Sequence, residues 1–524
     1  MAYAVHNFDY NTPTRLLFGR GKIERLPEVA AEFGKKVLLV YGGGSIKKLG
    51  IYDKVKTLLA DCEIYECAGV EPNPKVTSVN EGARLCREHD VDFVLAVGGG
   101  SVIDCAKAIC AARYYEGDAW DIVTDPSKIT KALPLVTVLT LAATGSEYDA
   151  AAVISNMDEN KKIGVLTPVF YPRVSICDPE YTFSVSKKQT AAGCADIMSH
   201  IFEQYCVKDS NLVSDGLCET VLRAVLGMGK RAYDKGDDYE ARATLMWASS
   251  LACNGICVTG NSFAAWVCHG IEHELSAFYD ITHGEGLAIV TPVFFRYSLN
   301  DETVGRFATL ANRVFDVPFE ADLYAMAEKG FQKLAAFFAS IGLPSQLSEV
   351  GITSDEHFEA MAESCMKLWD FSQAIRPLDK DEARCSRRPR EGGLFLRTAA
   401  RKKRVSRKRP TRSKETRKRS DLFVRRAATT RPLRFHPCGA PFPCLVSYRK
   451  CESFATTRMK IFLVFFDEST TRTRIFCKNP LFCKSTPYLL PLLAQPQKPV
   501  ANLSQSAYFQ AFFVRFLDGR VGNP

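Results

Sequence analysis

The segment Asp92-Phe-Val-Leu-Ala-Val-Gly-Gly-Gly-Ser101 joins a short apolar run to three glycines and a serine. An apolar run of this length that ends in glycine is typical of a buried strand, and the following residues, 102–113, have helical periodicity. The same order occurs earlier, where a run at 36–41 enters Gly42-Gly-Gly-Ser45 and then a helix. Strands that alternate with helices in this way predict a parallel sheet with helices on both faces.

This alternation extends over residues 1–183 and then stops. Further strands are expected at 63–67, 135–139 and 173–177, with an edge strand in the opening segment 8–19. From residue 184 onward apolar residues recur with a helical period, which predicts helices at 187–207, 211–233, 238–257, 261–278, 284–297, 301–316, 321–341 and 355–370. We therefore expect an α/β domain at 1–183 and an all-helical domain at 184–383, with a cleft between them as the place for chemistry.

The two Gly-Gly-Gly-Ser runs place exposed amides at a helix N-terminus, where the helix dipole favours an anion such as a phosphate. A tight turn without a ligand is the alternative, but two such runs in the same context favour a dinucleotide. Asp104 either stabilises the N-terminus of its helix or binds the nicotinamide ribose. The strand at 36–41 ends in Gly42, without the carboxylate that takes the ribose hydroxyls of NAD(H). Because Ser45, Lys47 and Lys48 follow, we favour NADP(H).

Histidine is rare in this chain, with eight residues in all. His269 and His273 lie four residues apart, as do Asp196 and His200, so each pair shares one face of a helix. Together with His283, which follows a short loop, they offer a set of metal donors. Three imidazoles and one carboxylate, from Asp196, His200, His269 and His283, suit a single divalent ion such as Fe²⁺ or Zn²⁺.

Two other interpretations compete with this metal site. Each histidine alone is more often a buried core or helix-end residue than a ligand. The segment His269-Gly-Ile-Glu-His273 also matches the H-x-x-E-H pattern of a zinc peptidase, with Glu272 as the general base. That alternative leaves Asp196, His200 and both glycine runs without a role.

Longer motifs carry a resemblance to a known family: Gly98-Gly-Gly-Ser-Val-Ile-Asp-Cys-Ala-Lys107, Leu139-Thr-Leu-Ala-Ala-Thr-Gly-Ser-Glu147, Asp178-Pro179, Ala192-Gly-Cys-Ala-Asp-Ile-Met-Ser-His200 and the segment from His269 to Gly286. Over residues 5–381 the sequence resembles the iron-containing (group III) alcohol dehydrogenases, and within them the butanol dehydrogenase branch. The resemblance implies a dehydroquinate synthase-like architecture, with an N-terminal dinucleotide-binding α/β domain, a C-terminal helical domain and a divalent metal in the cleft. It also implies an NAD(P)-dependent alcohol dehydrogenase or aldehyde reductase that acts on short-chain aldehydes or primary alcohols.

The same resemblance implies roles for single residues. Asp196, His200, His269 and His283 match the metal ligands of the family. His273 matches the nearby histidine that is not a ligand; we expect it to relay a proton, with packing beside the ligands as the alternative. In relatives that use NAD an Asp stands at the position of Gly42, which agrees with NADP(H). The residues that match the cofactor lining are Gly42, Gly43, Ser45, Asn73, Gly98, Gly99, Gly100, Ser101, Asp104, Thr140, Thr144, Ser146 and Lys162.

Charge divides the 524-residue chain near residue 384. Residues 1–383 contain 36 Lys and Arg against 52 Asp and Glu, whereas residues 384–524 contain 32 against 7. Beyond the break the sequence has no sustained periodicity, so we expect a basic tail of low order. We favour an out-of-frame or read-through translation for residues 384–524 over the alternative, a basic arm that binds nucleic acid.

The remaining composition predicts a soluble cytoplasmic protein. Of 19 cysteines, 13 precede residue 384 without paired spacing, which is typical of buried thiols in a reducing compartment. The N-terminus lacks the order of a signal peptide, and no apolar run approaches the roughly eighteen residues of a membrane helix. We expect a homodimer, a small aldehyde or alcohol substrate, no membrane partner, and no nucleic acid bound to residues 1–383.

Overall fold

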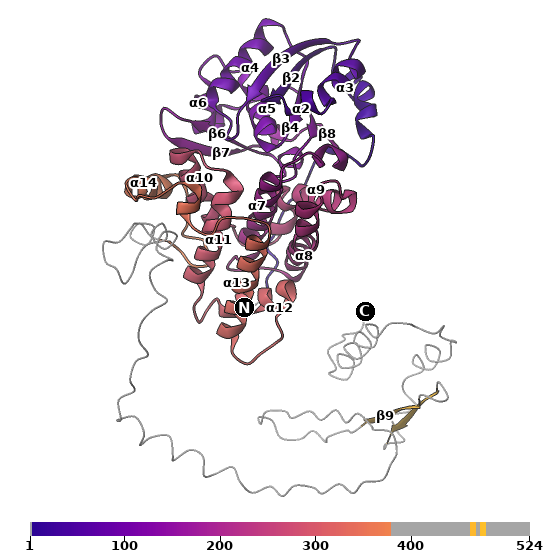
Figure 1. The fold of residues 1–524 in the computed structure, drawn as a ribbon, viewed down its shortest axis with the longest axis vertical. Coiled ribbons are helices and arrows are strands. Elements are labelled where there is room, and N and C mark those ends of the chain that lie inside the picture. The colour runs from indigo at the N-terminus through magenta and orange to yellow at the C-terminus, as the bar shows by residue number, and fades with distance from the viewer. Residues whose placement is uncertain (1–2, 379–461, 468–471, 478–524) are drawn as a thin grey trace, which may run out of the picture. The chain divides into compact units, whose positions relative to one another are not determined.

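The computed structural model describes residues 3–378, 462–467 and 472–477. A six-stranded parallel sheet organises the first part of this chain, in the order β1-β8-β5-β4-β2-β3. Figure 1 labels β2, β3, β4 and β8 of this sheet. Because both faces of the sheet are covered, every residue of the central strand β4 is buried. The strands are β1 (Arg15–Phe18), β2 (Lys36–Gly42), β3 (Glu63–Val70), β4 (Phe93–Gly98), β5 (Leu135–Leu139) and β8 (Val174–Cys177).

Helices form a separate core on each face of this sheet. Successive residues of a strand point to opposite faces, so Leu38 and Val94 enter one core while Leu39 and Leu95 enter the other. The first core is closed by α4 (Val76–Glu88), α5 (Gly100–Ala112) and α6 (Ala119–Thr124). The second is closed by α1 (Leu26–Ala31), α2 (Ser45–Lys48) and α3 (Ile51–Leu58).

The helical part begins where a serine caps the next helix. The Ser186 side chain accepts a hydrogen bond from the amide of Gln189 and starts α7 (Lys187–Tyr205). Asn211 and Asp238 cap the two following helices in the same way. These helices share one apolar core and are α7, α8 (Leu212–Asp234), α9 (Tyr239–Cys253), α10 (Val267–Tyr279), α11 (His283–Ser298), α12 (Val304–Phe315), α13 (Leu323–Ser340) and α14 (Phe358–Leu368).

Two local features differ from the sequence-based predictions. An antiparallel hairpin of β6 (Ala151–Asn156) and β7 (Lys161–Leu166) was not expected, and β7 packs against α10. The helix expected from residue 261 begins only at Val267. Its N-cap, Trp266, has φ of 53°, in the left-handed region, so the preceding residues cannot continue the helix.

The predicted fold class, an α/β part with a parallel sheet followed by an all-helical part, is confirmed. The predicted basic tail at 384–524 lies outside the described residues except for one antiparallel pair, β9 (Phe462–Asp467) and β10 (Arg472–Cys477). A search of the described helices finds none with the length and apolar character that a bilayer crossing requires.

Candidate active site

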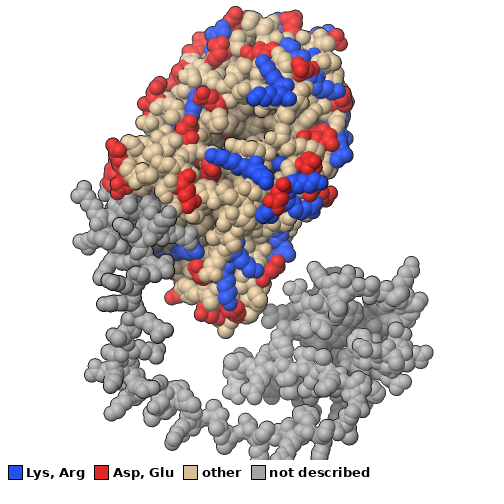
Figure 2. Space-filling model, viewed as in Figure 1, with Lys and Arg blue, Asp and Glu red and all other residues tan. Residues whose placement is uncertain are grey.

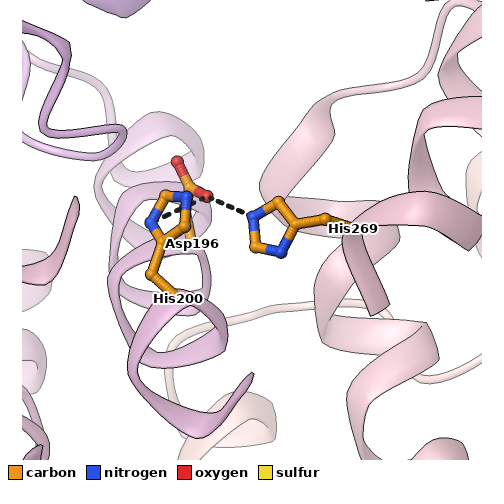
Figure 3. Close-up of side chains that lie close together, drawn as sticks. All are labelled: Asp196, His200 and His269. Carbon is orange, nitrogen blue, oxygen red and sulfur yellow. Dashed lines mark ion pairs between the residues drawn. The ribbon is translucent and has the colours of Figure 1, made fainter. Parts of the chain in front are cut away.

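Side chains from three helices meet around the carboxylate of Asp196. Asp196 and His200 lie one turn apart on α7, His269 is on α10 and His283 is the first residue of α11. Oδ1 of Asp196 lies 3.7 Å from Nδ1 of His200, 3.8 Å from Nε2 of His269 and 3.6 Å from Nε2 of His283. Figure 3 shows Asp196 directed between the rings of His200 and His269. The donor atoms of these three residues lie within 4.8 Å of one another.

This donor set fits a bound cation. Asp196 Oδ1, His200 Nδ1 and His269 Nε2 are buried and have no hydrogen-bond partner among the described residues. Buried polar atoms without a partner are costly, so a group that satisfies all three at once stabilises the site. A tetrahedral ion with ligands at about 2.1 Å separates its donors by about 3.4 Å. The separations measured from Asp196 are close to that value, so Asp196, His200 and His269 fit one divalent ion. Nε2 of His283 lies at a similar distance from Asp196, 3.6 Å, but the donors of His283 group with Glu272 and His273.

Two glutamates behind the histidines fix the orientation of the rings. Glu203 on α7 contacts Nδ1 of His269 and accepts a hydrogen bond of 2.6 Å from the amide of Cys268. Glu272 on α10 contacts Nδ1 of His283. In a neutral ring, a carboxylate that accepts the Nδ1–H hydrogen bond leaves the lone pair on Nε2, the atom of each ring that faces Asp196.

The charges around Asp196 set the protonation states of the donor atoms. Burial opposes ionisation of Asp196, but His200, His269 and His283 together lower its pKa to about 2, so the carboxylate is ionised at neutral pH. Burial lowers the pKa of His200 to about 4, which leaves that ring neutral. For His269 burial also disfavours the charged form, but Glu203 and Asp196 prevail and raise its pKa to about 9.

Lys162 and His273 lie beside these residues. Lys162 is on β7, and its Nζ lies 3.4 Å from Oε2 of Glu272 and 3.3 Å from Nδ1 of His283. The ring of His273 is centred 5.6 Å from that of His283 and 5.5 Å from that of Trp369. Its Nδ1 is buried without a hydrogen-bond partner among the described residues. Burial and the ammonium of Lys162 hold the pKa of His273 well below its usual range.

The two glycine runs lie at the carboxyl ends of adjacent strands, β2 and β4. A Cβ at Gly98 would lie 2.6 Å from Val102, and one at Gly100 would lie 2.3 Å from Oγ1 of Thr144. Both glycines therefore allow the chain to turn tightly into α5. Space around Gly43 is open, with no atom within 4 Å of a Cβ placed there. Amides at such a turn are suited to a phosphate.

Several other predicted cofactor residues hold the loops together. Both carboxylate oxygens of Asp104 are engaged, by Oγ of Ser146 at 2.5 Å and by the amide of Val153 at 2.9 Å. The side-chain amide of Asn73 donates to Asp280 Oδ1 at 2.9 Å, which links the loop after β3 to the end of α10. The amide of Thr140 donates a hydrogen bond to the carbonyl of Gly98, the first residue of the glycine run that includes Gly99 and ends at Ser101. Roles for these residues and for Gly42 and Ser45 in cofactor binding stay predictions.

Comparison with known families decides the relationship. A family model described as "Iron-containing alcohol dehydrogenase" matches residues 13–179. A second, "Fe-containing alcohol dehydrogenase family, C-terminal", matches residues 190–383. The chain belongs to the iron-containing alcohol dehydrogenase family. The sequence-based predictions of this family and of alcohol dehydrogenase or aldehyde reductase activity are confirmed. The H-x-x-E-H peptidase alternative gains no support, because Nε2 of His269 faces Asp196 and Glu272 contacts His283 and Lys162.

Individual relatives agree with this assignment. NADH-dependent butanol dehydrogenase A of Clostridium acetobutylicum is 52% identical over 380 residues, which cover 72% of this chain and 97% of the relative. NADPH-dependent aldehyde reductase YqhD of Escherichia coli is 36% identical over 355 residues, which cover 66% and 90%. The crystal structure of NADH-dependent butanol dehydrogenase A from Thermotoga maritima has a TM-score of 0.70 at 37% identity, covering 76% of this chain and all of that one.

The sequence reasoning missed the two carboxylates that orient the histidines in this alcohol dehydrogenase. A signal for Glu203 exists, because it follows Asp196 by seven residues and His200 by three and so shares their face of α7. Glu272 was considered only as the base of a peptidase. Its contact with His283 depends on how α10 and α11 pack, which no local spacing reveals.

Proposed function

We propose that this alcohol dehydrogenase transfers a hydride between NADP(H) and short-chain aldehydes or primary alcohols, with one divalent ion held by Asp196, His200, His269 and His283. The convergence of the three histidine rings on Oδ1 of Asp196 carries the proposal. A substrate such as butanal is suggested by two relatives at about 50% identity, both named as butanol dehydrogenases. The nicotinamide cofactor itself follows from the family.

In this scheme the residues of the chain bind and orient the ion and the cofactor. When bound, the ion supplies Lewis acidity at the substrate oxygen, and the nicotinamide supplies or accepts the hydride. Asp196 and the three imidazoles hold the ion in a buried place, where the negative charge that develops on the substrate oxygen is most effectively stabilised. The amides after β2 and β4 hold the cofactor phosphates.

We propose His273 as the residue that moves the proton. Its ring lies next to two of the predicted ligands without being one of them, and its Nδ1 has no hydrogen-bond partner among the described residues. Its low pKa keeps the ring neutral before the reaction. We propose that this neutral ring relays the proton of an alcohol to solvent during oxidation and from solvent to the alkoxide during reduction.

Replacement of a single ligand tests the site. We expect His269→Ala to abolish both metal uptake and turnover, measured by metal analysis of the purified protein and by NADPH consumption with butanal. Turnover that survives complete removal of metal from the wild-type enzyme would contradict the proposal.

The preference for NADP(H) rests on Gly42 and on the open space at Gly43. The relatives divide on this point, because butanol dehydrogenases at 46–52% identity are named for NADH and the aldehyde reductase at 36% for NADPH. A comparison of kcat/KM for the two cofactors decides it. We expect NADPH to be preferred and Gly42→Asp to shift the ratio toward NADH, whereas an unchanged ratio would refute the argument from the 2′-phosphate.

Three broader features complete the proposal. Thirteen free cysteines among the described residues support a reducing, cytoplasmic location. We propose a homodimer, which sedimentation would test.

We also propose that residues 384–524, which lie beyond the family match at residue 383, are not part of the native enzyme. An intact mass of 58.2 kDa for the native protein would contradict this.

A further inference from the structure

Glu272 is a fully buried carboxylate that contacts two different parts of the site. Its Oε1 accepts a hydrogen bond of 2.5 Å from Oγ of Ser276, one turn further along α10. Its Oε2 contacts Nδ1 of His283 and lies 3.4 Å from Nζ of Lys162. One carboxylate therefore joins a predicted metal ligand to a residue predicted to line the cofactor.

The backbone of α11 leaves space for this arrangement. A Cβ at Gly286 would lie 2.7 Å from Cγ of Glu272, a separation that packed atoms do not adopt. Only glycine at this position lets the carboxylate occupy its place beside His283. The position of Glu272 is thus determined by α10, α11 and β7 together.

We propose that Glu272 is a positioning residue that orients His283 toward the metal ion, and that Lys162 balances its charge. The proposal rests on the metal site proposed above. The carboxylate accepts a hydrogen bond from Nδ1–H of His283, so the lone pair is on Nε2, the atom 3.6 Å from Oδ1 of Asp196. Without a carboxylate, the ammonium of Lys162, 3.3 Å from Nδ1, would favour the opposite tautomer.

Substitution of Glu272 and substitution of Lys162 should therefore change metal affinity in opposite directions. Glu272→Gln keeps the shape but removes the negative charge and leaves the ammonium of Lys162 uncompensated. We expect it to weaken metal binding about 10- to 100-fold, the usual effect of removing such a partner. Lys162→Met removes a positive charge near the cation and keeps the contact between Glu272 and His283. We expect it to bind metal as tightly as the wild type or more tightly.

The test measures the dissociation constant of Co²⁺ for the full-length protein by competition with a chelator, together with the absorption spectrum of bound Co²⁺. Glu274→Gln is the matched control, because Glu274 is a buried carboxylate on the same helix whose hydrogen bond among the described residues comes from Oγ of Ser364 and not from a predicted ligand. We expect the control to have the wild-type dissociation constant and spectrum, and Glu272→Gln to change both.

Wild-type affinity in Glu272→Gln would overturn the proposal, as would a tenfold loss of affinity in Lys162→Met. If Glu272→Gln does not fold, the Co²⁺ affinity of Lys162→Met alone decides. If Lys162 and Glu272 only held the structure together, loss of their contact would weaken Co²⁺ binding. If Glu272 orients His283, Lys162→Met does not weaken it. A wild-type protein that binds no Co²⁺ would instead refute the proposed metal site, so the two failures are distinguishable.

Discussion

A methyl group at Gly284 is expected to separate α11 from α7, two of the three helices that carry the predicted ligands. Gly284 is the second residue of α11, directly after His283, and packs on the backbone of α7. A Cβ at this position would lie 2.1 Å from the carbonyl oxygen of Ala192 and 2.6 Å from its carbon, whereas real Cβ contacts are essentially never under 3.0 Å. Because the obstacle is backbone, α11 must withdraw by about 1 Å, as overpacked cores require.

The cost of this movement is seen in stability and in metal binding. Overpacking of this kind costs about 1–3 kcal/mol of the free energy of unfolding. Nε2 of His283 would also leave its position 3.6 Å from Oδ1 of Asp196. A misplacement of about 1 Å in a preorganised site is worth about 100-fold in activity, so we expect Gly284→Ala to lose turnover and metal affinity together.

The matched control is another helical glycine in open space. Gly227 on α8 is exposed, and a Cβ placed there meets no atom within 4 Å. Since alanine favours a helix over glycine by up to about 1 kcal/mol, Gly227→Ala should be as stable as the wild type or more stable, with unchanged metal affinity. Chemical denaturation and chelator competition measure both variants. The reasoning is refuted if Gly284→Ala matches Gly227→Ala in both measurements.

Three further predictions concern protons. Metal binding should displace a proton from His269, whose pKa in the metal-free protein is about 9. The apparent dissociation constant of the metal should therefore rise about tenfold for each unit that the pH falls below 9. Chelator competition at pH 6 and 8 measures this, and equal dissociation constants at the two pH values would contradict it. His273→Asn should lower kcat about 100-fold or more at unchanged metal content, and a wild-type kcat would remove His273 from the proton path. Burial raises the pKa of Glu274 from 4.5 to about 7, so its contribution to stability is complete below about 4.5 and is lost as the pH rises through 7. Relative to the wild type, Glu274→Gln should therefore gain up to about 3 kcal/mol in the free energy of unfolding between pH 5 and pH 8, and a gap that does not change with pH would contradict this.

Regular elements were predictable where one physical signal dominated. The apolar runs before Gly42 and Gly98 became β2 and β4, and the period of 3.6 residues placed α7 to α14 within a few residues of their ends, apart from the start of α10. The hairpin of β6 and β7 was not predictable in this way, because its second strand, Lys-Lys-Ile-Gly-Val-Leu, has a glycine and two lysines and is stabilised by pairing with its partner.

The candidate site was predictable in its residue types and only partly in its arrangement. The spacing of Asp196 and His200 on one helix follows from sequence alone. That α10 and α11 bring His269 and His283 to the same oxygen atom depends on close packing, in which Gly284 lies against Ala192. The contact of Lys162 with Glu272 was not predictable either, because Lys162 lies on a hairpin that sequence periodicity did not reveal.

The most direct test of the metal site is anomalous diffraction from crystals of the enzyme loaded with Zn²⁺ or, without oxygen, with Fe²⁺. We predict a single ion within about 2.3 Å of Oδ1 of Asp196 and of one nitrogen each of His200, His269 and His283. An ion bound between His269 and His273, or no ion at full metal loading, would contradict the account.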